Sequence, residues 1–312
     1  MSTTTKATGA GVSLRRSQPR TGERLVEAVL FLAAFISVLT TIGIVVAIIG
    51  PTVEFFREPA VSFWDFLTGT EWTVLFAEAQ REFGVLPLVT ASLVTTLIAL
   101  AVAMPVGLGA AIYLAEYATP RARSVLKPLL EVLAGIPTVV YGFFALAFVA
   151  PELLGPLVGV GTFSMLSAGL VMGVMIIPTI ASVSEDAMSA VPNALRQGSA
   201  ALGANRMQTS LRVVFPAAFS GVVAAVVLGI SRAVGETMIV TIAGGQMVQM
   251  VSDPLQQGAT MTTFIANAAL GDSRVGSLEY DTLFAVGLCL FVLTLIVNLI
   301  AIELVRRFRQ EY

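Results

Sequence analysis

The chain has 312 residues, of which 56% are hydrophobic and only 12% are charged, and its mean hydropathy is +0.87. An ordinary soluble domain is about 25% charged, so this composition excludes a soluble globular protein and indicates an integral membrane protein. A net charge of −2 gives no sign of nucleic-acid binding. The absence of histidine excludes Ser-His-Asp catalysis and His/Cys metal clusters, and the single cysteine, Cys289, can form no intrachain disulfide.

Six apolar stretches are long enough to cross about 30 Å of hydrocarbon, and backbone exposed to lipid must satisfy its own hydrogen bonds as helix. The first stretch is too long for the apolar region of a signal peptide, and Gly50-Pro51 offers no cleavage site. The sequence therefore predicts an all-α integral membrane protein whose six transmembrane helices cover residues 25–49, 87–115, 129–150, 163–184, 216–243 and 282–302.

The distribution of Lys and Arg predicts the orientation of these helices. Five positive residues precede residue 25, and three lie in each of the 116–128 link, the 185–215 link and the C-terminal end, against three in total on the other side. We therefore expect both termini and both links to be cytoplasmic. Residues 1–24 form a polar tail near the lipid headgroups, and residues 305–312 form a short C-terminal end.

Residues 50–86 form the longest extracytoplasmic segment, and this segment is acidic and rich in aromatic residues. Two interpretations stay open for it. A short helix lying at the membrane interface would place the aromatic rings where they are favoured, and a docking surface for an external partner would also need them. The aromatic residues are Phe55, Phe56, Phe63, Trp64, Phe66, Trp72, Phe76 and Phe83.

Two prolines lie within or beside the second and third apolar stretches and are expected to act as helix hinges, Pro105 and Pro137. Proline in a transmembrane helix frees a carbonyl group and bends the axis. Glycines in the second and fourth stretches are interpreted as packing positions that let neighbouring backbones approach closely, namely Gly107, Gly109, Gly169 and Gly173.

The 185–215 link is too long and too regular for a plain connector. It predicts one helix from Asn193 to Leu202, a break at Gly203, and a second helix from Asn205 to Val214. Asparagine favours the start of a helix, and glycine favours the position after its end. A cytoplasmic helical hairpin with apolar residues to bury indicates a contact surface.

Arg232 and Glu236 interrupt the fifth apolar stretch. At a spacing of four residues they would lie on one helical face, well inside the membrane. A charge at such depth costs on the order of 2.5 to 3.5 kcal/mol, so these residues are expected to face a protein interior or an aqueous path. Two further interpretations stay open: Glu236 as the ion carrier of a secondary anion transporter, and a pair that only fixes helix packing.

The chain lacks an ATP-binding loop of its own. That loop needs a lysine in a Gly-rich turn, but Lys6 lies in the tail and Lys127 is followed by Pro128. No metal site is expected either. The chain is therefore predicted to be non-catalytic and to bind no cofactor.

The stretch "QGSAALGANRMQTSLRVVFP" (197–216) resembles the EAA loop of binding-protein-dependent ABC importer permeases. Together with "GIPTVVYG" (135–142), "SRAVGETM" (231–238) and the aromatic opening segment, it makes nearly the whole chain similar to PstC-type permeases of the high-affinity phosphate importer. The resemblance implies a type I ABC importer (MetI-like) permease fold over residues 87–304, with a cytoplasmic coupling-helix hairpin.

The resemblance also implies a set of partners in a prokaryotic cell (inner) membrane. These are a PstA-type permease subunit, two ATPase subunits that use ATP and Mg²⁺, and an extracytoplasmic phosphate-binding protein. Phosphate would pass along Arg232 and Glu236.

ATPase coupling would rest on Gln197, Gly198, Ser199, Gly203, Ala204 and Pro216. Gln197 stands where the motif has its glutamate, and Gly198-Ser199 replace two alanines. This departure removes the carboxylate but keeps the helix-Gly-helix frame.

Overall fold

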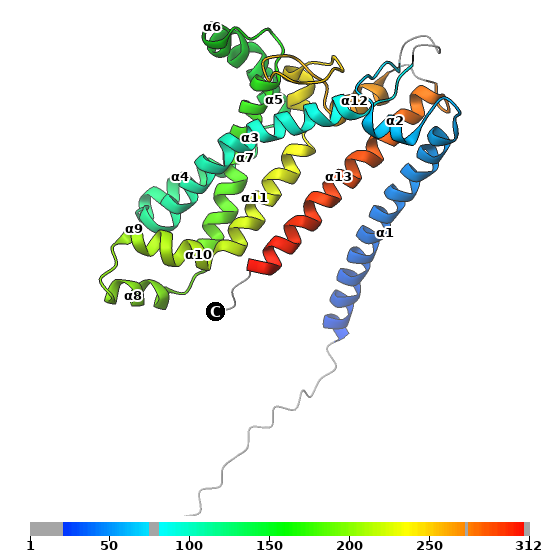
Figure 1. Cartoon of the computed structure of the whole chain (residues 1–312). Coiled ribbons are helices and arrows are strands. Elements are labelled where there is room, and N and C mark those ends of the chain that lie inside the picture. The colour runs from blue at the N-terminus through cyan, green and yellow to red at the C-terminus, as the bar shows by residue number, and fades with distance from the viewer. Residues whose placement is uncertain (1–20, 75–80, 272–273, 309–312) are drawn as a thin grey trace, which may run out of the picture. The chain divides into compact units, whose positions relative to one another are not determined.

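The computed structural model describes residues 21–74, 81–271 and 274–308 (Figure 1). The chain divides into two compact units, residues 1–47 and residues 48–312. Helix α1 (Thr21–Arg57) begins in the first unit and is apolar. Its threonine hydroxyls donate to backbone carbonyls of the preceding turn, as the Thr40 hydroxyl does to the Ile36 carbonyl at 2.9 Å. The helix passes through Pro51 and is longer than the expected span 25–49.

Small residues bring two long helices of the second unit together, α3 (Leu86–Ile112) and α7 (Met165–Ser189). A Cβ atom added at Gly173 would lie 2.8 Å from the Ala99 carbonyl oxygen, and one added at Gly169 would lie 2.7 Å from Ile98. The packing role predicted for Gly169 and Gly173 is thus confirmed, and Gly107 packs on α7 in the same way. Among the described residues of this chain, Gly109 has no neighbour within 4 Å, so the packing role predicted for it stays a prediction.

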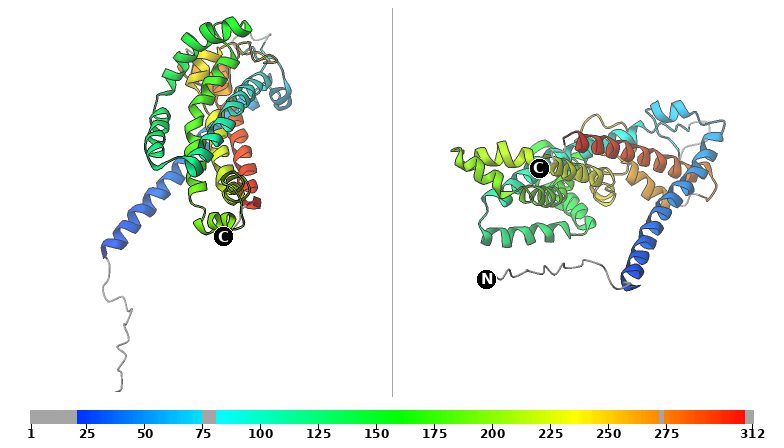
Figure 2. Two further views of the ribbon diagram at one scale, coloured as in Figure 1. Left: turned by 90° about the vertical axis from the view of Figure 1, so that its left-hand side faces the viewer. Right: turned by 90° about the horizontal axis from the view of Figure 1, so that it is seen from below.

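A third helix packs along this pair, and a fourth packs on the third. Helix α11 (Phe219–Val234) contacts both α7 and α13 (Leu278–Phe308), and the two views of Figure 2 show them running side by side. The core that results is apolar, with Met172, Met175 and Ile176 of α7 fully buried at its centre. These helices form the frame on which the polar sites described below are placed.

The third span differs from its prediction. The chain forms helix α4 (Pro120–Ala134), breaks at residues 135–137, and continues as α5 (Thr138–Phe144), the π-helical segment η3 (Ala145–Leu154) and α6 (Gly155–Val158). The predicted helix 129–150 is therefore wrong, because proline at 137 has no N–H to continue a helix and disfavours helical geometry at residue 136. Residues 138–158 are long and apolar enough to cross a membrane.

The fifth span is also interrupted. Helix α9 (Arg206–Thr209), the π-helical segment η4 (Ser210–Val214) and α10 (Phe215–Ala217) meet α11 at a bend of 73°. Helix α11 then ends at Val234, and a second π-helical segment, η5 (Val240–Gly244), follows. The single helix predicted over 216–243 is wrong. Among the described residues, five helices are long enough to span a membrane, and the bent pair makes a sixth if it is one span.

The aromatic segment folds onto the second unit's own helices. Phe55, Phe66 and Trp72 are buried together with residues of α12 (Met261–Leu270) and α13, and the Trp72 ring lies 4.9 Å from that of Phe264. Only two aromatic side chains of the short helix α2 (Phe63–Thr68) project outward: Phe63 is 54% exposed and Trp64 is 70% exposed. Most of the rings therefore form an internal core, which neither interpretation predicted. Phe76 lies outside the described residues.

Candidate functional site: a helical hairpin and an arginine at the end of α11

A helical hairpin projects from the second unit between α7 and α11 (Figure 1). It consists of α8 (Asn193–Ala201), a turn, and the α9–η4 helix, and is called here the 193–214 hairpin. Gly203 has φ = +83° in the turn, which confirms the predicted break. Asn205 accepts a hydrogen bond from Gln208 N–H at 2.8 Å, and the Gln208 side chain accepts from Asn205 N–H in return. This reciprocal cap fixes where the second helix starts.

The outer face of the hairpin carries exposed apolar side chains. Leu202 is 91% exposed, Met207 is 62% exposed and Leu211 is 44% exposed, whereas Leu195 packs against the hairpin's own base. Exposed large apolar side chains on a polar hairpin are consistent with a contact with another protein. The coupling residues predicted from the resemblance lie on this hairpin and at its end: Gln197, Gly198, Gly203 and Pro216 are exposed, and Ser199 and Ala204 are half-buried.

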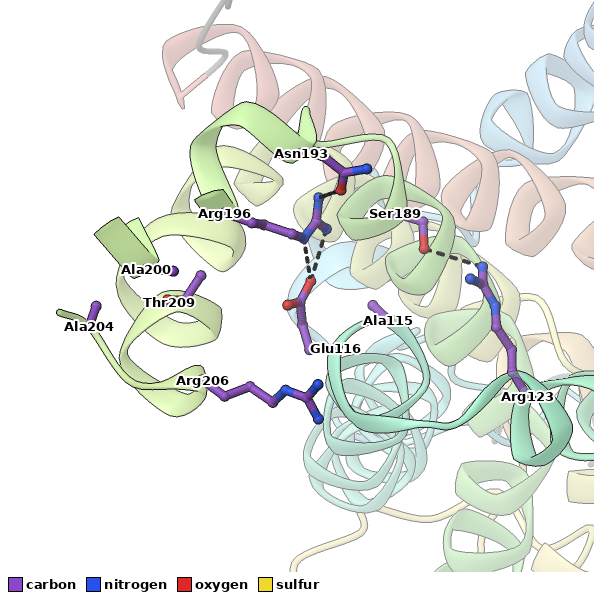
Figure 3. Close-up of a pocket in the computed structure, with 10 residues that line it drawn as sticks. All are labelled: Ala115, Glu116, Arg123, Ser189, Asn193, Arg196, Ala200, Ala204, Arg206 and Thr209. Carbon is purple, nitrogen blue, oxygen red and sulfur yellow. Dashed lines mark hydrogen bonds and ion pairs between the residues drawn. The ribbon is translucent and has the colours of Figure 1, made fainter. Parts of the chain in front are cut away.

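A cavity of about 510 Å³ separates the hairpin from the end of α3 (Figure 3). Arg196 of α8 crosses it to Glu116, which lies in η2 (Tyr113–Tyr117), the π-helical continuation of α3. Nε and Nη2 of Arg196 donate to Glu116 Oε1 at 3.1 and 2.9 Å. The Glu116 side chain is only 7% exposed. Its charge is therefore shielded from solvent and paired with Arg196.

A second buried carboxylate joins α4 to α7. Glu185 is fully buried and accepts from Arg123, from Lys127 Nζ at 2.7 Å and from Ser189 at 2.8 Å. Lys127 also pairs with Asp186 at 2.7 Å, and the hydrogen bonds to Asp186 and Glu185 raise the pKa of Lys127 above its ordinary value. No local sequence pattern predicts this cluster, because its two basic residues lie about 60 residues before Glu185 in the chain.

Arg232 and Glu236 do not form the predicted arrangement. Arg232 lies in the last turn of α11, and its Nη1 donates to Thr179 Oγ1 of α7 at 3.1 Å. Glu236 follows the end of the helix, and its Oε1 accepts backbone N–H bonds from Met238 at 3.1 Å and Ile239 at 3.3 Å. The expected common helical face is wrong, because the Glu236 carboxylate caps a new helical turn instead of continuing the old one.

No ion pair joins Arg232 to Glu236 in the described parts of the chain. Helix α12 stabilises the break that follows α11, because the Thr262 hydroxyl donates to the Glu236 backbone carbonyl at 2.7 Å. Arg232 is half-buried and makes one hydrogen bond among the described residues, although a guanidinium has five N–H donors.

The two prolines predicted to be hinges differ in their surroundings. Pro137 stands at the break between α4 and α5, and there the Tyr141 hydroxyl donates to the Leu133 carbonyl at 2.9 Å across the break. Pro105 lies inside α3, on an exposed face, and the helix continues through it. Within the described residues no group of three or more His, Cys, Asp or Glu could hold a metal ion.

The chain matches a known protein family over two thirds of its length. Residues 103–310 match the model of a family described as the inner membrane component of binding-protein-dependent transport systems. The chain belongs to this family. It is therefore a multi-pass membrane protein of the transport permease class. The family match begins inside α3, so the aromatic segment and the first helix lie outside it.

Two relatives and one solved structure are similar to this permease. It is 37% identical over 268 residues to a probable ABC transporter permease protein, YqgH, of Bacillus subtilis, covering 86% of this chain and 84% of that protein. It is 37% identical over 279 residues to the phosphate transport system permease protein PstC 1 of Mycobacterium tuberculosis, covering 78% and 81%. The resemblance to PstC-type permeases is thus confirmed.

The solved structure is an inward-facing MetNI methionine ABC transporter. One of its chains superposes with a TM-score of 0.55 at 19% identity, covering 73% of this permease and 95% of that chain. This likeness confirms the predicted all-α, MetI-like fold.

Proposed function

We propose that the chain is a transmembrane permease subunit of an ATP-driven phosphate importer in a prokaryotic cell (inner) membrane. The observation that carries this proposal is the 193–214 hairpin with its exposed apolar face, on a chain whose relatives include phosphate transport permeases. ATP hydrolysis elsewhere in the complex would move the hairpin and change access to the path. The chain itself would be a non-catalytic conduit and lever.

The proposal implies a defined set of partners. A PstA-type permease would form the path together with this chain, two ATPase subunits would bind ATP and Mg²⁺, and an extracytoplasmic phosphate-binding protein would deliver the substrate. In this arrangement both termini and the hairpin are cytoplasmic, in agreement with the Lys and Arg distribution. The protein surface within the hydrocarbon layer contacts membrane lipid.

Within the path, Arg232 would supply a fixed positive charge for phosphate. Its planar guanidinium matches phosphate oxygens and stays charged when water is excluded. Glu236 would support this position by fixing the break that follows α11, through the backbone N–H bonds of Met238 and Ile239. This role for Glu236 does not favour the alternative of a secondary anion transporter, which needs Glu236 as a mobile ion carrier.

The contact with the ATPase can be tested by co-purification. Leu202→Asp places a charge beside the turn of the hairpin and should reduce the amount of ATPase that purifies with the complex by about 30-fold, because a truncated central apolar contact costs on the order of 2 kcal/mol. Leu270→Asp is the matched control, since Leu270 is similarly exposed but lies on α12, remote from the hairpin. Equal recovery of ATPase from both variants would rule out the hairpin as its binding surface.

A further inference from the structure

Arg196 connects three separate parts of the permease. From α8 it donates to the Met188 carbonyl at 2.8 Å and to the Val191 carbonyl at 2.5 Å, at the end of α7 and just beyond it. Its remaining strong contact is the ion pair with Glu116 at the end of α3. A single guanidinium therefore holds the hairpin, α7 and the continuation of α3 in one joint.

The ion pair between Arg196 and Glu116 is largely shielded from solvent. The Arg196 side chain is 20% exposed and that of Glu116 is 7% exposed, and two nitrogens share one carboxylate oxygen. Breaking a buried ion pair leaves an uncompensated charge, so the pair resists separation. A lysine could not replace it, because an ammonium group lacks the planar fork of donors that reaches a carboxylate and two carbonyls together.

The second helix of the hairpin is tied to the same place. The Arg206 guanidinium lies 5.8 Å from the centroid of the Tyr117 ring, next to Glu116 in η2. Both helices of the hairpin thus contact the last turn of the α3 continuation, and the cavity between them is lined partly by small side chains, Ala115, Ala200 and Ala204 (Figure 3). The cavity gives the hairpin room to tilt, while Arg196 keeps its connection.

Helix α7 extends from this joint to the candidate phosphate residue. Met188, which Arg196 contacts, and Thr179, which contacts Arg232, are nine residues apart in α7, or roughly 14 Å along a helix at 1.5 Å per residue. Helix α7 is packed against α3 at Gly169 and Gly173 without space for larger side chains. A displacement at its cytoplasmic end is therefore transmitted as a movement of a rigid pair of helices.

We propose that Arg196 is a positioning residue that transmits movement of the 193–214 hairpin to α3 and α7 through Glu116 and the end of α7. This inference rests on the proposed function, because it assigns the connection between ATP hydrolysis and the phosphate path. This role is separate from docking of the ATPase on the hairpin. Arg196 contacts the other helices of the permease, and it would connect hairpin movement to them without touching phosphate.

The test measures phosphate taken up per ATP hydrolysed, with the complete complex in proteoliposomes. The variant Arg196→Gln with Glu116→Gln removes both charges together and strands neither. We expect it to assemble and to hydrolyse ATP at about the wild-type rate, whereas phosphate per ATP falls by about tenfold, the upper range for loss of a coupling residue. Arg196→Lys, which keeps the charge, should lower the same ratio by about threefold.

The matched control is Arg81→Gln with Glu279→Gln, which neutralises a similarly exposed ion pair on the extracytoplasmic side. It should keep the wild-type ratio. A wild-type ratio in either Arg196 variant, or an equal loss in the control, would overturn the assignment of Arg196. Failure of the proposed function has a different signature, because the wild-type complex itself would then show no ATP-dependent phosphate uptake.

Discussion

Replacing Arg232 by methionine is expected to lower phosphate uptake by about 100-fold, the equivalent of about 2.8 kcal/mol at 1.4 kcal/mol per factor of ten. The physical reason follows from the proposed role of Arg232, because methionine would remove the fixed positive charge assigned to the phosphate path. The change is structurally mild, because Arg232 has one hydrogen bond among the described residues, to Thr179, and no ion pair that the substitution would strand. Assembly and ATP hydrolysis should persist, and uptake is measured with radiolabelled phosphate in cells.

Two controls separate a role in the path from a role in packing. Thr179→Val removes only the hydroxyl that Arg232 contacts, so uptake should stay within about threefold of wild type, the loss of one hydrogen bond. Glu236→Gln keeps a carbonyl oxygen that can accept the same two N–H bonds, and should also be tolerated. Near-normal uptake by Arg232→Met would make Arg232 a structural residue, and abolished uptake by Glu236→Gln would favour the ion-carrier mechanism.

The Gly203→Val substitution is expected to abolish uptake while the subunit still inserts into the membrane. No atom of the described residues lies within 4 Å of a Cβ at this position, so the expected effect comes from the backbone. At φ = +83° a β-branched residue is strongly disfavoured, and the turn would have to open. The two helices of the hairpin would then lose their relative position, and ATP would be hydrolysed without transport.

The matched control for this substitution is Gly198→Ala in the first helix of the same hairpin. Gly198 also has no neighbour within 4 Å, but its φ is not positive, so alanine fits its helical geometry. Gly203→Asn is the intermediate case, since asparagine tolerates the left-handed region better than valine does. Normal uptake by Gly203→Val would show that the hairpin is not the lever.

Local signals explain what could be predicted from the sequence. The hairpin follows from Gly203 and Asn205, because a left-handed turn and a helix cap are set by neighbouring residues. The close packing at Gly169 and Gly173 follows from their spacing of four residues on one helical face. These features need no knowledge of which helices meet.

Long-range contacts could not be predicted in the same way. Arg196 and Glu116 are 80 residues apart, and Trp72 meets Phe264 only after the aromatic segment has folded onto α12. At Glu236 the error was of another kind. The apolar run predicted a continuous helix that included Glu236. In the structure the Glu236 carboxylate instead accepts backbone N–H bonds and caps a new helical turn, so this residue interrupts the helix in which it was placed.

ATP-driven phosphate uptake by purified components tests the central claim most directly. The chain would be reconstituted with a PstA-type permease and the ATPase subunits in liposomes, with ATP inside and the phosphate-binding protein outside. Phosphate should accumulate only when ATP and every component are present, and an imposed ion gradient should not replace ATP. Phosphate accumulation driven by an ion gradient without ATP, or ATP hydrolysis that never moves phosphate, would contradict the account.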